Sequence, residues 1–178
     1  MSTATRTDLI EFLRRQRQSR QFTDEPVSDA DLHEILEVMR WTGSSKNSQP
    51  WQFVVVREPD LKAKLATATQ YTGWIAEAPV VIVIVTEGET PKAHAYDEGR
   101  VSERILLAAQ ALDLGAGVVT FAPKSAMALV KDTLGIPDDQ SVYSAVALGH
   151  PVPPKEASPL AGRKPLDELV HWNRFDGK

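Results

Sequence analysis

The chain has 178 residues, of which 42% are hydrophobic and 25% are charged, proportions that are ordinary for one packed globular domain. Its net charge of −4 disfavours a module that captures nucleic acid by broad electrostatic attraction. It has no cysteine, which excludes disulfides, thiolate metal sites, iron–sulfur clusters and cysteine nucleophiles.

Two capping boxes predict two helices near the N-terminus. Thr5 and Asp8 have the spacing of the first box, and the helix that they open leads into a basic run at residues 14–20. Ser28 and Asp31 form the second box. The apolar residues that follow it are spaced as one face of a helix: Leu32, Ile35, Leu36 and Met39.

The middle of the chain alternates between predicted strands and helices. Residues 51–57 are rich in β-branched and aromatic side chains, which favour a strand, and residues 61–68 suggest a short helix. Residues 80–85 are an unbroken apolar run, typical of a strand buried on both faces. Residues 97–113 predict a long helix that is apolar on more than one face, so we expect it in a core or an interface.

The last third of the chain predicts two more strands, at residues 115–122 and 142–148. The helix between them has Pro123 in its first turn and ends at Gly135. Residues 151–178 are rich in proline at their start and read as an extended tail. Strands and helices in this mixed order favour an α/β or α+β fold with helices on both faces of a sheet.

Motifs that carry their own catalytic groups are absent from the sequence. The four histidines lie far apart, without the spacing of metal ligands, and there is neither a nucleophile elbow nor a phosphate-cradling glycine loop. We therefore predict no metal site and no catalytic side chain. An enzyme that lacks these groups can borrow its chemistry from a bound cofactor.

Membrane and export signals are also missing. No apolar run reaches the roughly 18 residues of a membrane span, and the N-terminus has no apolar leader. We expect a cytoplasmic protein with neither membrane nor nucleic-acid partners.

Two polar segments suit ligand binding. Arg17 and Arg20, with Gln and Ser between them, could grip a phosphate through bidentate hydrogen bonds. Cations at this position would equally complement the dipole of the preceding helix. Residues 43–51 gather hydroxyl and amide side chains just before a strand, which suits a heteroaromatic edge and a polyol chain, although an ordinary helix-to-strand turn is the alternative.

Together these segments resemble the motifs of the FMN-dependent nitroreductase family. The residues that match the two motifs are Arg17, Arg20, Phe22, Ser44, Ser45, Asn47, Gln49, Pro50 and Trp51. Gly43 stands where the family usually has proline, while Gln16 and Gln18 stand where it has arginine and serine. Further matches follow in order at residues 97–121, 134–137, 147–151 and 163–166, so the resemblance covers nearly the whole chain.

The resemblance implies an α+β, nitroreductase-like sandwich with a mixed sheet of four to five strands flanked by helices. Residues 1–178 would form a single FMN-binding domain, and two chains would form an intertwined homodimer with FMN at the subunit interface. The residues that would bind FMN are Arg17, Gln18, Ser19, Arg20, Ser44, Ser45, Asn47, Gln49, Thr120, Phe121, Arg163 and Lys164.

The same resemblance assigns a role to each group of residues. Residues 17–20 would hold the phosphate and ribityl chain, with Arg163 and Lys164 completing the phosphate clamp. Residues 44–49 would line the ribityl chain and ring, with Ser44, Ser45 and Asn47 coming from the neighbouring subunit. Backbone at residues 120–121 would lie near the flavin N5.

The implied activity is hydride transfer from NADH or NADPH through flavin N5 to a small oxidant, such as a nitroaromatic, a quinone or a flavin, in a ping-pong cycle. Two alternatives stay open. One is a flavin-fragmenting or dehalogenating enzyme on the same fold. The other is a carrier or regulatory protein that binds FMN without turnover.

Overall fold

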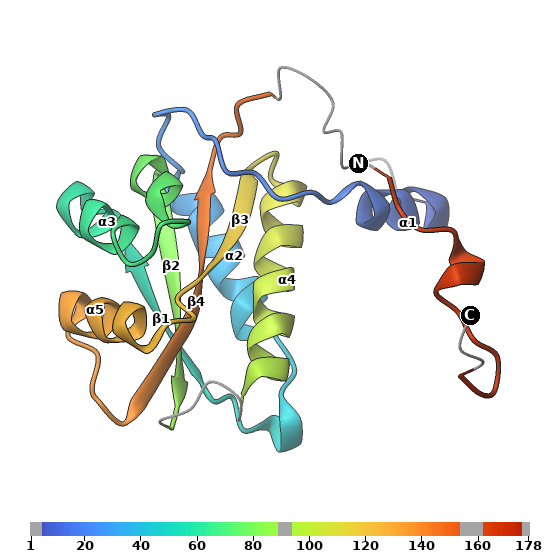
Figure 1. Ribbon diagram of the computed structural model, residues 1–178. Coiled ribbons are helices and arrows are strands. Elements are labelled where there is room, and N and C mark those ends of the chain that lie inside the picture. The colour runs from blue at the N-terminus through green and yellow to red at the C-terminus, as the bar shows by residue number, and fades with distance from the viewer. Residues whose placement is uncertain (1–4, 89–93, 154–161, 176–178) are drawn as a thin grey trace.

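A four-stranded sheet with strand order β1-β2-β4-β3 organises the computed structural model, which describes residues 5–88, 94–153 and 162–175. Helices α2 and α4 cover one face of the sheet, and α3 and α5 cover the other (Figure 1). The strands are β1 Trp51–Val56, β2 Val80–Glu87, β3 Gly115–Thr120 and β4 Gln140–Gly149. The helices are α1 Arg6–Arg15, α2 Asp29–Arg40, α3 Pro59–Ala66, α4 Ala95–Ala111 and α5 Lys124–Leu134.

The prediction of an α+β fold is confirmed, but the sheet is not mixed. All three neighbouring strand pairs in the described residues are antiparallel. The crossover from β2 through α4 to β3 does run between two strands of the same direction. β4, from the far end of the chain, lies between them and pairs with both, so no parallel pair forms.

The apolar run of β2 is buried on both faces, as its composition predicts. Val81 and Val83 pack into the core on the α3 and α5 side, while Ile82 and Ile84 pack into the core on the α2 and α4 side. All four are fully buried. Each buried side chain of this size contributes roughly 1.5–3 kcal/mol. Because β2 contributes side chains to the clusters on both faces of the sheet, it is the centre of the hydrophobic core.

The capping residues predicted from the sequence lie at the ends of three helices, α1, α2 and α5. The Thr5 hydroxyl accepts a hydrogen bond from the N–H of Asp8, and the Ser28 hydroxyl accepts one from that of Asp31. Gly135 ends α5 with a left-handed φ of 67°, which glycine adopts without strain. Pro123 lies one position earlier than expected, as the N-cap of α5.

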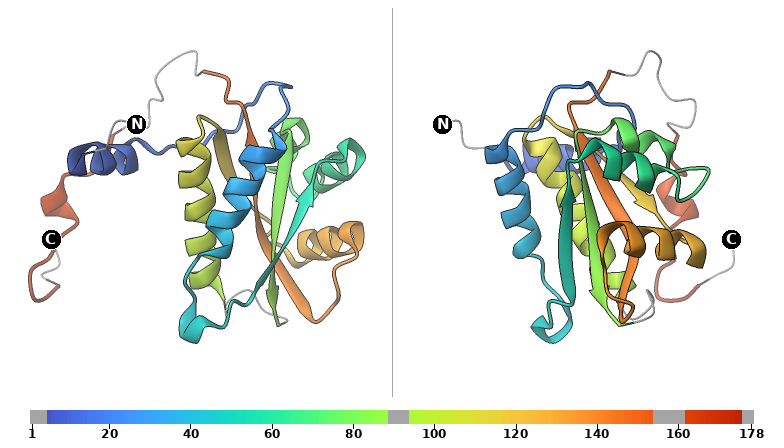
Figure 2. Two further views of the ribbon diagram at one scale, coloured as in Figure 1. Left: turned by 180° about the vertical axis from the view of Figure 1, so that it is seen from behind. Right: turned by 90° about the vertical axis from the view of Figure 1, so that its left-hand side faces the viewer.

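Two segments project from the body on the same side: α1, and the described part of the tail from residue 162 onward (Figures 1 and 2). None of the residues of α1 is buried. Both segments expose apolar side chains, namely Leu9, Ile10, Leu13, Leu166, Leu169, Trp172 and Phe175. Among the described residues, no helix is both long and apolar enough to cross a membrane.

Candidate functional site

Residues 16–22 leave α1 and run along the edge strand β3. The N–H of Ser19 donates to the carbonyl oxygen of Ala116 at 2.8 Å, and the N–H of Val118 donates to Gln18 Oε1 at 3.1 Å. A side chain at Gly117 would collide with the carbonyl oxygen of Ser19, so glycine there permits the close approach. The glutamine that departs from the family motif at position 18 thus caps the edge strand through its side chain.

Arg20, at the end of this segment, opens onto a pocket of ≈ 930 Å³ between β3 and the connection from α3 to the short 3₁₀ helix η2 (Gly73–Glu77). Its guanidinium lies 5.9 Å from the centre of the Trp74 ring. Among the described residues, no carboxylate forms an ion pair with Arg20. The residues that line the pocket include Arg20, Gln70, Tyr71, Trp74, Val118 and Thr120.

This pocket fits a ligand that combines an anionic group with a flat ring. Its volume lies within the roughly 300–1,000 Å³ that is typical of small-molecule sites. Arg20 supplies a cation that no carboxylate of the described residues pairs with, and Trp74 supplies an aromatic face. Val119, Ala122 and Pro123 add apolar surface. A phosphorylated heteroaromatic cofactor such as a flavin nucleotide matches this donor set.

Arg17 has a different environment from Arg20. Its Nη1 donates to the carbonyl oxygens of Arg14 at 2.8 Å and Gln16 at 2.6 Å, the unpaired carbonyls at the end of α1. Of the two interpretations of the basic run, the helix-end one therefore describes Arg17 in this structure. Arg20 alone faces the pocket.

The second motif, residues 44–49, lies at the opposite end of the sheet from residues 16–22 (Figures 1 and 2). It contains the 3₁₀ turn η1 Ser45–Asn47 and is closed by the N–H of Gln49, which donates to Ser44 Oγ at 2.8 Å. Asn47 and Gln49 are exposed. Within one chain the structure does not bring the two motifs together.

Thr120 and Phe121 have separate roles. Thr120 is the last residue of β3, is exposed and lines the pocket. Phe121 is fully buried in the core, and its N–H donates to the carbonyl oxygen of Tyr143 at 2.7 Å. The backbone donor of Phe121 is therefore used by the sheet.

Arg163 and Lys164 are exposed at the start of the described tail. Within the described ranges, Arg163 forms one hydrogen bond, from Nη1 to the carbonyl oxygen of its neighbour Gly162 at 3.4 Å. The tail lies on the α1 side of the molecule, away from the α3 and η2 side that bounds the pocket (Figure 1). One chain therefore does not assemble the expected three-part phosphate clamp.

No motif in the sequence identified one group of pocket residues. Gln70, Tyr71 and Trp74 line the pocket from a connection without any motif. The aromatic pair in a short polar stretch was the one available signal.

Two buried charged groups were also missed. Ser144 Oγ donates to Glu98 Oε1 at 2.5 Å, and burial raises the pKa of the Glu98 carboxyl above its ordinary value. Lys62 Nζ donates to the carbonyl oxygen of Ala78 at 2.6 Å, and burial lowers the pKa of this amine. Lys62 lies on α3 between the exposed charged residues Asp60 and Lys64, and Glu98 lies on α4 next to the equally buried Asp97, so charge pattern alone did not reveal which side chains are buried.

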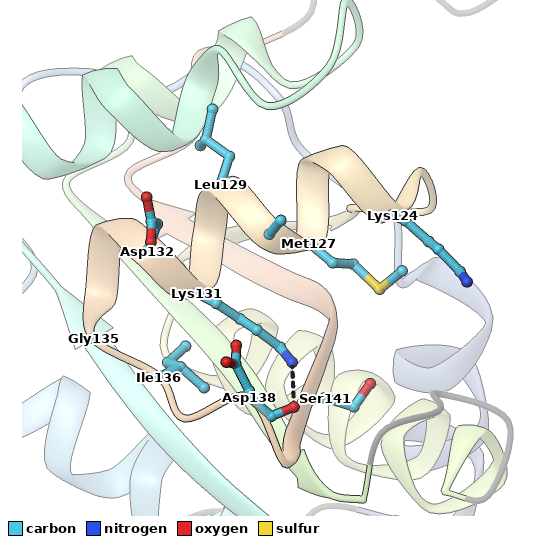
Figure 3. A pocket seen from close by; sticks show the side chains of 10 residues that line it. Lys124, Met127, Leu129, Lys131, Asp132, Gly135, Ile136, Asp138 and Ser141 are labelled. Carbon is cyan, nitrogen blue, oxygen red and sulfur yellow. Dashed lines mark hydrogen bonds between the residues drawn. The ribbon is translucent and has the colours of Figure 1, made fainter.

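A second pocket, of ≈ 790 Å³, surrounds α5 and the start of β4 (Figure 3). Lys131 reaches from α5 to the following loop, where its Nζ donates to the carbonyl oxygen of Asp138 at 3.0 Å. None of the residues predicted to bind a ligand lines this pocket. In the part of the chain that the structure describes, no cluster of acidic residues and histidines could hold a metal ion.

Comparison with known proteins identifies the family. The sequence profile of the nitroreductase family matches residues 13–72 and 68–150. A protein of Archaeoglobus fulgidus named after NADH dehydrogenase and NAD(P)H nitroreductase activities is 30% identical over 155 residues, covering 84% of this chain and 88% of the relative. An iodotyrosine deiodinase of Nematostella vectensis is 26% identical over 196 residues, covering 92% of this chain and 74% of the relative.

Solved structures give the same result. The structure of an FMN-dependent nitroreductase from Clostridium difficile R20291 matches with a TM-score of 0.82 at 25% identity, over 93% of this chain and 99% of the other. The arrangement of strands and helices described above is thus that of a known fold. This chain belongs to the nitroreductase family.

Proposed function

We propose that this protein is an FMN-dependent oxidoreductase that passes a hydride from NAD(P)H to a small oxidant, such as a nitroaromatic, a quinone or a flavin, by a ping-pong cycle. The observation that carries the proposal is Arg20, exposed and without an acidic partner among the described residues, beside the Trp74 ring in a pocket of suitable size. The names of the relatives, which include nitroreductases and an FMN-dependent enzyme, support it.

FMN, when bound, supplies the hydride chemistry, so the protein needs to supply binding and orientation. Arg20 would bind the phosphate, and Trp74 would cover one side of the ligand. Gln18 and Ser19 would contribute by fixing the backbone that carries Arg20 against β3. Thr120 would form part of the pocket wall beside the reacting ring.

A second copy of the chain would complete the site. The loop of residues 44–49 and the segment of residues 16–22, which brings Arg20 to the pocket, lie at opposite ends of the sheet (Figure 1), which supports the proposal that Ser44, Ser45 and Asn47 serve the pocket of the neighbouring subunit. The exposed apolar side chains of α1 and the described tail support a homodimer in which these two segments pack against the partner chain. The single domain of residues 1–178 would then use residues 151–178 to bring Arg163 and Lys164 to a phosphate.

Dehalogenation is the second candidate function, favoured by the similarity to an iodotyrosine deiodinase. Such an enzyme would bind a halogenated phenol over the cofactor. A carrier that binds FMN without turnover is the third. The three differ in which acceptor, if any, reoxidises the reduced protein.

The deciding experiment is steady-state NADH and NADPH oxidation by the FMN-loaded protein with a quinone, a nitroaromatic and a halophenol as acceptors. The proposal expects turnover with a quinone or nitroaromatic and parallel double-reciprocal plots at several acceptor concentrations. Intersecting lines would contradict the ping-pong cycle. Turnover with the halophenol alone would favour dehalogenation, and FMN binding without any turnover would favour the carrier.

A further inference from the structure

We propose that Asp97 and Arg100, at the start of α4, are positioning residues that hold the loop of residues 44–49 in its ligand-binding conformation, and that Gly43 is glycine because Arg100 occupies the space beside it. This inference rests on the proposed function, since it takes the loop to contact the flavin. It assigns a role to two side chains for which the family resemblance implied none.

The loop has a backbone conformation that needs support from outside. Lys46, Asn47 and Gln49 have φ values of 52°, 55° and 50°, in the left-handed region that non-glycine residues rarely adopt. Such residues persist where their surroundings fix them, and they concentrate at binding sites. The bond from Gln49 N–H to Ser44 Oγ closes the loop on itself but does not attach it to the body.

Asp97 attaches the loop to the body. Its Oδ2 lies 3.4 Å from the backbone nitrogen of Ser45, which donates to it, although the two residues are 52 positions apart. Asp97 is only 6% exposed, and it lies in the first turn of α4, where the helix dipole favours a negative charge. A buried carboxylate at this place fixes the backbone of the loop at the residue where the 3₁₀ turn begins.

Arg100 holds Asp97 from the other side. Its Nη1 lies 3.5 Å from Asp97 Oδ1, one turn along the same helix. Its Nη2 would lie 3.1 Å from a Cβ built at Gly43, which is closer than an ordinary contact. A side chain at position 43 would therefore press on the guanidinium, which must shift by a few tenths of an ångström, and would disturb its 3.5 Å contact with Asp97. The proline that is usual in the family motif at this position would do so, whereas glycine leaves the space to Arg100.

This arrangement predicts which property of the ligand each residue affects. Ser44, Ser45, Asn47 and Gln49 carry hydroxyl and amide groups, which suit the ribityl chain and ring rather than a phosphate. Loss of the loop conformation should then weaken FMN and riboflavin alike. Loss of Arg20 should weaken FMN alone.

The test is a double-mutant cycle on the purified full-length protein, with FMN and riboflavin affinities measured by fluorescence quenching. Gly43→Ala and Arg100→Ala should each weaken both ligands about tenfold, the loss of roughly one hydrogen bond to a charged group. The double variant should be no weaker than Arg100→Ala alone, because both changes act on the same contact between Arg100 and Asp97. Arg104→Ala, one turn further along α4, is the matched control and should bind like the wild type.

A second pair of variants tests Asp97. Asp97→Asn keeps an oxygen that can accept the N–H of Ser45 and should retain most of the affinity, whereas Asp97→Ala should lose about tenfold for both ligands. Amide hydrogen exchange at residues 44–49 gives a readout that does not need a ligand, and it should speed up in Asp97→Ala and Gly43→Ala.

The outcomes separate this inference from the proposed function. Additive losses in the double variant, or unchanged affinity and exchange in Gly43→Ala, would overturn the inference while leaving the FMN site intact. A wild-type protein that binds no flavin would overturn the proposed function, and hydrogen exchange would still decide whether Asp97 and Arg100 hold the loop.

Discussion

The two ends of the sheet differ in whether their charged side chains are exposed or buried. At the end where residues 16–22 lie alongside β3, Arg20 is exposed beside Trp74, without an acidic partner among the described residues. At the other end, the first turn of α4 buries two carboxyl groups, with Asp97 6% and Glu98 4% exposed. An exposed unpaired cation is available to a ligand, whereas a buried carboxyl group organises the protein around it. At the first end the charged side chain itself is available to a ligand, whereas at the second end the buried Asp97 holds the loop that would contact the ligand.

The largest expected effect concerns the exposed cation. Arg20→Ala should weaken FMN binding about ten- to a hundredfold, because a charge-assisted hydrogen bond contributes about 1.5–3 kcal/mol. Riboflavin lacks the phosphate and should bind nearly as before. Arg20→Lys should recover part of the loss, since a point charge does not reproduce the bidentate fork. Fluorescence titration with both ligands measures these effects.

Arg17 is the matched control for Arg20, since its guanidinium is used by the carbonyls of the α1 end. Arg17→Ala should change FMN affinity much less than Arg20→Ala. Arg163→Ala should behave like Arg20→Ala if the tail completes the clamp. Equal loss of FMN and riboflavin in Arg20→Ala would mean that this residue supports the fold.

An intermediate effect is expected from mixing subunits. If each site takes Arg20 from one chain and Asn47 from the other, a heterodimer of Arg20→Ala and Asn47→Ala chains has one intact site and one site with both changes. Differently tagged, co-expressed chains should therefore bind FMN with wild-type affinity at half of their sites, while each variant homodimer has none. Heterodimers without a wild-type site would show that each chain builds its own site.

The smallest effect should come from the buried carboxyl group of Glu98. Its folded-state pKa is raised above the value of 4.5 expected in the unfolded chain, so its contribution to stability is complete below that value and is lost as pH rises through the folded pKa. Glu98→Gln stays neutral and keeps an oxygen for the Ser144 hydroxyl. The variant should gain stability over the wild type as pH rises, with no gain at low pH.

Thermal melts over a pH series measure the Glu98 effect. Glu103→Gln, an exposed position on the same helix, is the control and should follow the wild type at every pH. A gain for Glu98→Gln that is the same at all pH values would mean that the carboxyl group does not change its charge in the expected range.

The elements of this fold follow from local chemistry, and their arrangement does not. The caps at Thr5 and Ser28 and the left-handed Gly135 are fixed by neighbours within a few positions, so the sequence reveals them. The place of β4 between β2 and β3 depends on pairing between residues far apart, such as Val83 with Ala145. No local pattern distinguishes that order from a parallel pair of β2 and β3.

The candidate site likewise contains residues that the sequence predicts and residues that only the fold reveals. Arg20 and the loop of residues 44–49 were predicted because their residue types match a motif. Trp74 and Gln70 were missed because only the folded connection between α3 and η2 brings them to the pocket. Asp97 was missed because an acidic residue in the first turn of a helix normally faces water, and only the packing of the loop against it shows otherwise.

The central position of β4 also bears on how the chain folds during synthesis. β1 and β2 leave the ribosome first and can pair at once, but the other side of β2 has no neighbour until residues 140–149 have been made. β3 has its ladder partner in β4 as well and must wait for the same segment. A nascent chain therefore displays an apolar, unpaired strand edge for much of its synthesis, which is the kind of surface that chaperones bind and that aggregates form on.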